Sequence, residues 1–290
     1  MGRLIRGITS LGEIMAVALD GTDIVAKAEQ IHKTSATATA ALGRLLCAAS
    51  MMGNAIKKED GSITIKIAAD GPMGTVMAVS DSHGNVRGYV NNPLVELPLN
   101  DAGKLDVSGG VGKNGILHVI KDNGSGEPFV GSVPLVSGEI AEDITSYYAL
   151  SEQIPTVCAL GVLVNPDLTV KAAGGYIIQL LPGADDACID KLEASIEKMP
   201  PVSKMLNEGL SLEEMLNKAL SDFEFDVLTD TTVEYKCNCS QKRVEKALIS
   251  LGSKELEDMV ADGKDIEIKC QFCDKIYTLS TAEIKGLIKK

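Results

Sequence analysis

Two cysteine motifs near the C-terminus constrain the folding of this chain more than any other feature. Cys237 and Cys239 form a Cys-x-Cys motif, and 30 residues separate it from the Cys-x-x-Cys motif of Cys270 and Cys273. Four thiolates at such spacings are typical of a tetrahedral zinc site, with each sulfur about 2.3 Å from the metal. Because thiolates fill all four positions, no position is left for a reactive water. We therefore predict one structural Zn²⁺ bound by these four cysteines.

The length of the C-terminal region makes a metal site important for its folding. Residues 234–290 are few enough that their core must be small, and such domains usually need a metal or another cross-link. Zinc binding contributes about 10–16 kcal/mol to the folding of small zinc peptides. We predict a C-terminal zinc-binding domain over residues 234–290, with helices that begin near Ser240, Ser253 and Thr281 and a strand over residues 265–269.

The one-residue gap between Cys237 and Cys239 also bears on redox chemistry. A disulfide between them would close a very small, strained ring, and strained disulfides are easily reduced. Thiolates bound to zinc are already deprotonated, which is the form that oxidants attack. From the residues alone the motifs fit two interpretations, a redox switch or an inert structural zinc site.

Residues 1–182 have the patterns of a mixed domain. Residues 34–57 are rich in Ala, Leu and Met and predict a long buried helix, whereas residues 62–68 alternate apolar and polar side chains as a half-buried strand does. A further helix is expected from Ser137, as its N-cap, to Gln153. Because helices and strands do not alternate regularly, we predict an α+β fold with a mainly antiparallel sheet and packed helices. The other expected strands cover residues 11–19, 74–79, 86–90, 114–122, 127–136, 157–164 and 168–180.

The composition changes after Pro182. Residues 183–235 carry 13 acidic residues against four lysines, and their apolar residues recur at helical spacing, interrupted by Pro200 and Pro201. Repulsion among the acidic side chains lowers the stability of such a segment, so it needs a neighbouring surface to stay folded. We predict that residues 183–233 form an acidic, metastable helical linker between the two domains.

Charge and composition argue against several classes of function. A net charge of −12 at pH 7 disfavours general nucleic-acid binding. Residues 234–290 are close to neutral and hold few aromatic side chains for base stacking. A structural zinc ribbon that binds nucleic acid or a protein partner is nevertheless the alternative function. The cysteine usage, and the lack of an apolar stretch of membrane-spanning or signal-peptide length, predict a cytoplasmic protein without membrane contact.

We do not expect an enzyme. Residues 109–115 superficially resemble a phosphate-binding loop, but Val107 stands in place of its first glycine and Asn114 in place of the residue that would bind magnesium. The Cys-x-x-Cys motif does not lie in a βαβ unit, which argues against a thiol–disulfide oxidoreductase. Three histidines have no nucleophile motif near them and are expected to be solvated or packed: His32, His83 and His118.

Three cysteines lie outside the motifs. Cys47 falls in the predicted long helix and Cys158 in a predicted apolar strand, so both are expected to be small core residues. Cys188 falls in the acidic linker, a position that favours exposure. Its acidic neighbours are expected to raise the pKa of its thiol and make it slow to react.

The chain as a whole resembles the heat shock protein 33 family of redox-regulated bacterial chaperones. Besides the cysteine motifs, the resemblance rests on Ser240-Gln-Lys-Arg-Val-Glu-Lys-Ala-Leu directly after the first motif. Upstream, and in order, it includes Thr37-Ala-Thr-Ala-Ala-Leu-Gly-Arg, Gly88-Tyr-Val-Asn-Asn-Pro, Gly131-Ser-Val-Pro-Leu-Val-Ser-Gly-Glu-Ile-Ala-Glu-Asp, Ser151-Glu-Gln-Ile-Pro and Ala172-Ala-Gly-Gly-Tyr-Ile-Ile-Gln-Leu-Leu-Pro-Gly-Ala.

This resemblance implies an ATP-independent holdase chaperone that is inactive while reduced and zinc-bound. Oxidation would join Cys270 to Cys273 and Cys237 to Cys239 by disulfides and release the zinc. The linker and the C-terminal domain would then unfold and expose apolar surface that binds unfolding client proteins. The oxidised, active form would be a homodimer.

Overall fold

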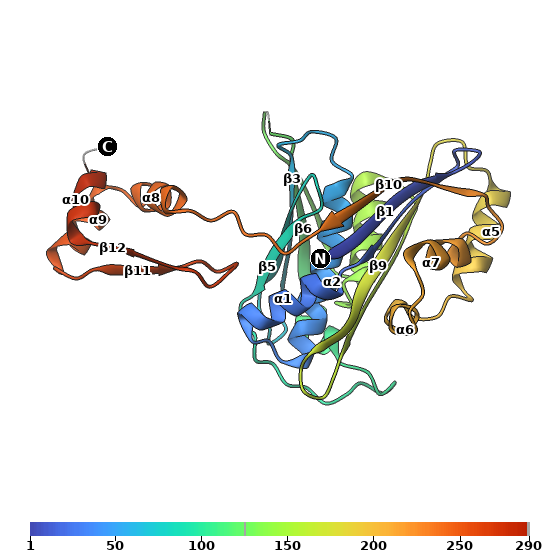
Figure 1. The fold of residues 1–290 in the computed structure, drawn as a ribbon, viewed down its shortest axis with the longest axis horizontal. Coiled ribbons are helices and arrows are strands. Elements are labelled where there is room, and N and C mark those ends of the chain that lie inside the picture. Colours follow the sequence, from blue (N-terminus) through green and yellow to red (C-terminus); the bar gives the residue numbers. More distant parts are fainter. Residues whose placement is uncertain (125, 289–290) are drawn as a thin grey trace. The chain divides into compact units, whose positions relative to one another are not determined.

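The computed structural model describes residues 1–124 and 126–288 (Figure 1). The chain divides into two compact units, Met1–Lys236 and Cys237–Lys290. In the described part of the larger unit the strands form two five-stranded sheets, and every pair of neighbouring strands is antiparallel. The α+β class and the antiparallel sheets predicted from the sequence are confirmed.

The first sheet brings together strands from both ends of the larger unit. Its order is β10 (Phe225–Val233), β1 (Gly2–Thr9), β2 (Ile14–Asp20), β9 (Val170–Leu180) and β8 (Thr156–Val164). The second sheet has the order β5 (Val86–Val90), β4 (Val76–Asp81), β3 (Ser62–Ala69), β6 (Gly115–Asp122) and β7 (Phe129–Pro134).

A layer of helices lies between the two sheets. Its centre is α2 (Ala36–Asn54), which packs on strands of both sheets and is buried on nearly all sides. This burial follows from its composition of Ala, Leu and Met, since a helix that is apolar all round must be enclosed. The other elements of the helical part are α1 (Thr22–His32), α3 (Val107–Val111), α4 (Ala141–Tyr147) and the π-helical turn η1 (Tyr148–Glu152).

Three further helices cover the opposite face of the first sheet, as Figure 1 shows. They are α5 (Asp186–Ile196), α6 (Val202–Asn207) and α7 (Leu212–Ala219). Apolar side chains of the helices and of the sheet form a second core between them: Ile5, Ile14, Ala16, Ala18, Tyr176, Ile178, Cys188, Leu192, Val202, Met205, Leu212, Met215, Leu216, Ala219 and Leu220. The segment predicted as a helical linker thus contains these helices and, in addition, strand β10. Its assignment as a linker stays a prediction.

The predicted start of the helix over residues 137–153 is wrong. Helix α4 begins at Ala141, and Ser137 is not its N-cap. Instead, the buried carboxylate of Asp143 accepts hydrogen bonds from the backbone N–H groups of residues 136, 137, 138 and 140. These bonds satisfy the donors of a loop, so the chain before Ala141 does not need to be helical.

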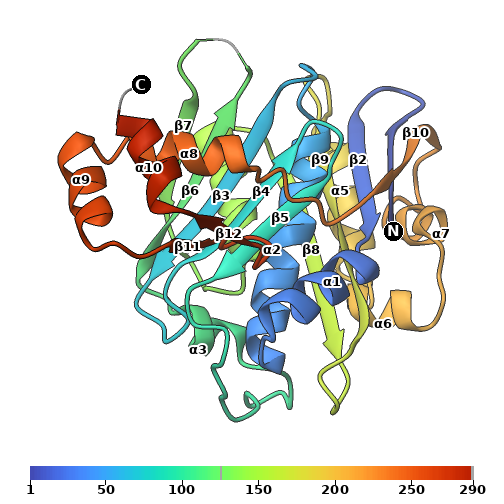
Figure 2. The same cartoon turned by 60° about the vertical axis from the view of Figure 1, so that its left-hand side comes forward.

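The smaller unit contains a hairpin and three helices within its described residues (Figure 2). These elements are α8 (Gln241–Ile249), α9 (Ser253–Ala261), β11 (Ile266–Lys269), β12 (Ile276–Leu279) and α10 (Thr281–Ile288). Each helix begins where the sequence predicts, and β12 is an additional strand that pairs with β11. The core consists of Leu248, Leu256, Leu279, Ile284 and Leu287. So small a core provides little stability by itself.

Candidate metal centre

All four cysteines of the two motifs come together in one cluster within the smaller unit. Their sulfur atoms lie within 4.8 Å of one another, and each cysteine is partly buried. Two separations join the two motifs: 3.7 Å between the sulfurs of Cys237 and Cys270, and 3.4 Å between those of Cys239 and Cys273. The four thiols are free, without a disulfide.

The first motif lies in an extended stretch directly before helix α8. Ser240 caps this helix, because its side chain accepts a 3.4 Å hydrogen bond from the backbone N–H of Arg243. The guanidinium of Arg243 in turn donates a hydrogen bond to the side chain of Asn238, the residue between the two cysteines. The capped helix therefore fixes the position of the intervening residue, and with it the two thiols.

The second motif forms the turn of the β11–β12 hairpin. The backbone N–H of Cys270 donates to the carbonyl of Lys275, and the N–H of Asp274 donates to the carbonyl of Cys270, each at 2.9 Å. Asp274 adopts a left-handed conformation, with φ of 60°, and its carboxylate forms a 2.9 Å ion pair with Lys269. This tight turn directs both thiols of the motif toward the first pair.

Tyr277 is a residue of this site that the sequence analysis did not identify. It lies in β12, its ring is buried, and its hydroxyl donates a 3.0 Å hydrogen bond to the sulfur of Cys239. The ammonium group of Lys275 lies 5.0 Å from the centre of the same ring. Its position four residues after the second motif could have indicated this role. The strand that follows a short hairpin turn stays close to the turn, and so to the cysteines in it.

The thiols differ in their tendency to ionise. Burial raises the pKa of Cys239, but hydrogen bonds from Tyr277 and from the neighbouring thiols outweigh it and lower the pKa to about 7. Burial, with contributions from neighbouring thiols, raises the pKa of Cys237 and of Cys273. Cys239 is therefore more readily ionised than Cys237 and Cys273, and a bound cation favours the thiolate form of these two.

The arrangement fits a metal ion in tetrahedral coordination. Four sulfurs about 2.3 Å from a central zinc lie about 3.8 Å from one another, and the two cross-motif separations are 3.4 and 3.7 Å. Four soft thiolate donors suit zinc better than magnesium or calcium, which prefer oxygen ligands. The cluster is therefore capable of binding a metal, and its donor atoms are those that a zinc ion requires.

The three remaining cysteines lie in the larger unit. Cys47 is buried in α2, where burial raises its pKa to about 12, and burial also raises the pKa of Cys158 in β8. The expected exposure of Cys188 is wrong: its residue is only 4% exposed, because α5 turns this side chain toward the first sheet. The pKa of Cys188 is raised by burial first and by Glu13 and Asp185 second.

The features that superficially suggested an enzyme have structural roles. Residues 109–111 form the end of α3, and Gly112 follows as its C-cap. At the start of this helix, the side chain of Asp106 accepts a 2.8 Å hydrogen bond from the N–H of Gly109. His83 lies in the β4–β5 hairpin and His118 in β6, where its ring lies 2.8 Å from the hydroxyl of Ser132. Among the residues that the structure describes, no helix has both the length and the apolar character needed to cross a bilayer.

Fold and site together define a class of protein: an α+β unit followed by a small unit built around four cysteines that can hold a metal. Comparison with known families matches residues 2–280 to the family described as Hsp33 protein. The chain therefore belongs to the Hsp33 family, a family of non-enzymatic chaperones.

Individual relatives match over almost their whole length. The 33 kDa chaperonin of Acetivibrio thermocellus is 47% identical over 286 residues, which cover 99% of this chain and 96% of the relative. The 33 kDa chaperonin of Geobacillus kaustophilus is 46% identical, with coverage of 98% and 96%. The crystal structure of the 33 kDa chaperonin from Thermotoga maritima matches with a TM-score of 0.90 at 37% identity and covers 99% and 97% of the two chains.

Proposed function

We propose that this protein is an ATP-independent holdase chaperone that oxidation switches on. The observation that carries the proposal is the cluster of four cysteine sulfurs within 4.8 Å of one another, in a chain of a chaperone family. The same sulfurs that are able to hold a metal are close enough to react with one another once oxidised. In the reduced, metal-bound form the chaperone is inactive.

The first step of the proposal is zinc binding. Cys237, Cys239, Cys270 and Cys273 bind one Zn²⁺ in the reduced protein, because four thiolates are a typical ligand set for this ion. The small core of the C-terminal unit supports a structural role for the metal. Loss of the metal removes the main constraint on residues 237–290 and unfolds them.

The second step is oxidation of the ligands. We propose disulfides between Cys237 and Cys239 and between Cys270 and Cys273. Each disulfide forms as two thiolates give up two electrons to one hydrogen peroxide, which takes up two protons from the solvent and becomes two waters. The shortest sulfur separations that join the motifs are 3.4 and 3.7 Å, whereas an S–S bond is about 2 Å long, so the cysteines of either pairing must move closer together after the metal leaves. Mapping the disulfides by peptide mass spectrometry tests this pairing, and cross-motif disulfides would overturn it.

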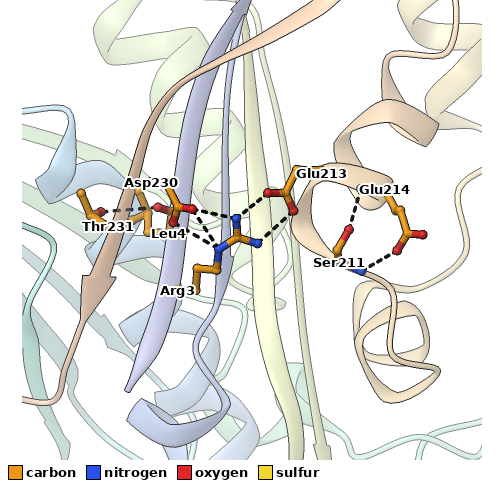
Figure 3. A network of polar contacts seen from close by, with 7 residues as sticks. All are labelled: Arg3, Leu4, Ser211, Glu213, Glu214, Asp230 and Thr231. Atoms are coloured by element: carbon orange, nitrogen blue, oxygen red, sulfur yellow. Dashed lines mark hydrogen bonds and ion pairs between the residues drawn. The ribbon is translucent and has the colours of Figure 1, made fainter.

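The third step is release of the linker, which we place at residues 183–233, between the N-terminal domain of residues 1–182 and the C-terminal domain of residues 234–290. One arginine supports this step. Figure 3 shows Arg3 of β1 between Asp230 on β10 and Glu213 on α7. Its guanidinium donates at 2.8 Å to Asp230 and at 2.9 Å to Glu213. This network is partly exposed, so it holds the linker only weakly.

Release of the linker explains how an apolar surface becomes available. Helices α5, α6 and α7 cover apolar residues of the first sheet, among them Ile14, Tyr176 and Ile178. When these helices leave, the covered face binds unfolding client proteins. We further propose that the oxidised form is a homodimer, and that the protein works in the cytoplasm, where its seven free cysteines stay reduced until oxidative stress.

One assay tests the switch. Aggregation of a heat-unfolded client is followed with zinc-loaded reduced protein and with peroxide-treated protein, while a chromogenic chelator reports released zinc. The proposal requires suppression of aggregation by the oxidised protein only, together with release of one zinc per chain. Equal suppression by both forms would leave a structural metal site without a switching role.

A further inference from the structure

Strand β10 is attached to the first sheet in an unusual way. Among its nine described residues only Val233 is buried, and most of the others are exposed. The strand nevertheless pairs with β1 along its whole length, from Gly2 opposite Val233 to Thr9 opposite Phe225. Backbone hydrogen bonds, and not side-chain packing, therefore hold most of β10 in place.

The pairing of β10 also contains a defect. The register shifts between Arg6 and Gly7, so that Leu228 has no partner on β1, and its side chain is 62% exposed. The residue after Leu228 is Thr229, whose side-chain hydroxyl is buried and has no hydrogen-bond partner within the described structure. A bulge interrupts the ladder of hydrogen bonds, and a buried polar atom without a partner costs stability. Both features weaken β10 at its centre.

Strand β1, the neighbour of β10 in the sheet, is able to pair with another strand if β10 is removed. Strand β1, Gly-Arg-Leu-Ile-Arg-Gly-Ile-Thr, contains neither proline nor an acidic residue, and β2 occupies its other side. Proteins usually protect exposed sheet edges with prolines, charges or covering elements. Here β10 provides the cover, with Asp226 and Asp230 on the outermost strand. Without β10, a straight row of backbone donors and acceptors on β1 would face solvent.

The chain after β10 links this strand to the candidate metal ligands. The N–H of Val86 in β5 donates at 3.0 Å to the carbonyl of Glu234, and the N–H of Lys236 donates at 2.8 Å to the carbonyl of Val86. The backbone thus passes from the edge of the first sheet to the edge of the second, and Cys237 follows at once. Loss of order at Cys237 reaches β10 through only three intervening residues.

From these observations we propose that β1, once β10 is released, binds an extended segment of a client protein as a new antiparallel strand. The inference rests on the proposed function, because it needs oxidation to release the linker. The occupant is an unfolded polypeptide, since pairing through the backbone accepts almost any extended sequence that lacks proline. Strand β10 itself shows that this edge retains a segment with almost no buried side chains.

A peptide binding experiment isolates the backbone pairing. The probe is a fluorescent peptide with the sequence of residues 229–233, Thr-Asp-Thr-Thr-Val, added in excess to the full-length oxidised protein. Two further peptides of the same sequence carry N-methyl groups on alternate residues in opposite phase. In an antiparallel strand the N–H groups of one phase point to the neighbouring strand and those of the other phase point away, so the two methylated peptides are matched controls for each other.

The strand proposal predicts that only one of the two methylated peptides loses binding, by about tenfold or more, since it lacks the amides that pair with β1. Amide hydrogen exchange should show that the unmodified peptide protects those amides of residues 2–6 that point away from β2 in the oxidised protein. Equal affinity of all three peptides, no binding, or protection elsewhere would overturn the proposal. Protection of those same amides without any peptide would overturn it too, because β10 or a second copy of the chain would then occupy the edge.

The same oxidised sample is also assayed for suppression of client aggregation. Suppression without phase-dependent peptide binding rejects the strand at β1 and leaves the redox switch standing. Absence of suppression rejects the proposed function itself, so the two failures are distinguishable.

Discussion

The hydroxyl of Tyr277 donates a 3.0 Å hydrogen bond to the sulfur of Cys239, a residue 38 positions earlier in the chain. The bond joins the return strand of the second motif's hairpin to a cysteine of the first motif. A donor that contacts a metal ligand from outside the coordination sphere adjusts the electron density on that ligand. If the cluster acts as the proposed redox switch, Tyr277 is therefore positioned to set how fast it reacts with an oxidant.

Replacing Tyr277 with phenylalanine should accelerate zinc release by peroxide several-fold. The substitution keeps the buried ring and removes the hydroxyl, so the thiolate of Cys239 becomes more basic and a better nucleophile. Chromogenic chelator assays with and without peroxide measure the effect, and the peroxide-free sample controls for simple loss of metal affinity. An unchanged oxidation rate would show that the hydrogen bond has no influence on reactivity.

The metal affinity should fall steeply as the pH is lowered. The pKa values of Cys237 and Cys273 are raised above the ordinary range of a thiol, so at pH 7 both thiols carry a proton that the metal must displace. Binding then releases at least two protons, and the affinity falls by at least about 100-fold per pH unit. Competition with a chelator between pH 6 and pH 8 tests this, and a slope below two in log affinity against pH would contradict it.

Replacing Arg3 with methionine should loosen the linker in the reduced protein. The change removes the hydrogen bonds to Glu213 and Asp230, a loss of about 1 kcal/mol for a network that is partly exposed. Amide exchange in α7 and β10 should become about fivefold faster, and less peroxide should be needed for activation. The control is Arg6→Met on the same strand, because Arg6 donates to the backbone carbonyl of Asn54 and not to the linker.

The contribution of Arg3 should also depend on pH. Its hydrogen bond lowers the pKa of Glu213 below the ordinary value of 4.5, so the pair stabilises the folded form fully above that pH. As the pH falls from 4.5 through the lowered pKa, Glu213 becomes protonated in the folded protein and the contribution disappears. The difference in α7 exchange between the wild-type protein and Arg3→Met should therefore shrink in acid. A constant difference would indicate a role of Arg3 that does not depend on this charge.

Cys188 should report linker release in the wild-type chain. In the reduced protein the residue is buried against the first sheet, and it should resist alkylation. After oxidation and removal of the peroxide, iodoacetamide should label Cys188 quickly, while Cys47, buried in α2, stays unlabelled. Mass spectrometry distinguishes the two sites. Protection of Cys188 after zinc release would mean that α5 remains in place.

The sequence predicted local features better than long-range ones. The four-cysteine cluster could be predicted because the cysteines of each motif are only one or two residues apart, and such spacing is typical of a shared metal site. The start of α8 was visible because Ser240 is a good N-cap. Strand β10 was not predicted, because its partner β1 lies more than 200 residues away and β10 lacks a buried apolar face. Strand β1 was not predicted either, although it also pairs with the nearby strand β2. The burial of Cys188 depends on how α5 packs on the sheet, which acidic composition does not indicate.

The path of residues 233–237 has a mechanical consequence. Counted back from Cys237, the bonds of Val86 to Lys236 and Glu234 come before the pairing of Val233 with Gly2. A loss of order that starts at Cys237 therefore breaks these backbone hydrogen bonds one after another from one end. The hydrogen bonds between β10 and β1 do not have to break all at once. The same path includes the buried side chain of Val233 and the 2.8 Å hydrogen bond from the hydroxyl of Tyr235 to the carbonyl of Gly88, so these contacts must break before the rest of β10 opens. Because Cys237 follows the C-terminal end of β10, the strand separates from β1 starting at that end. The N-terminal end of β10, opposite Thr9, separates last.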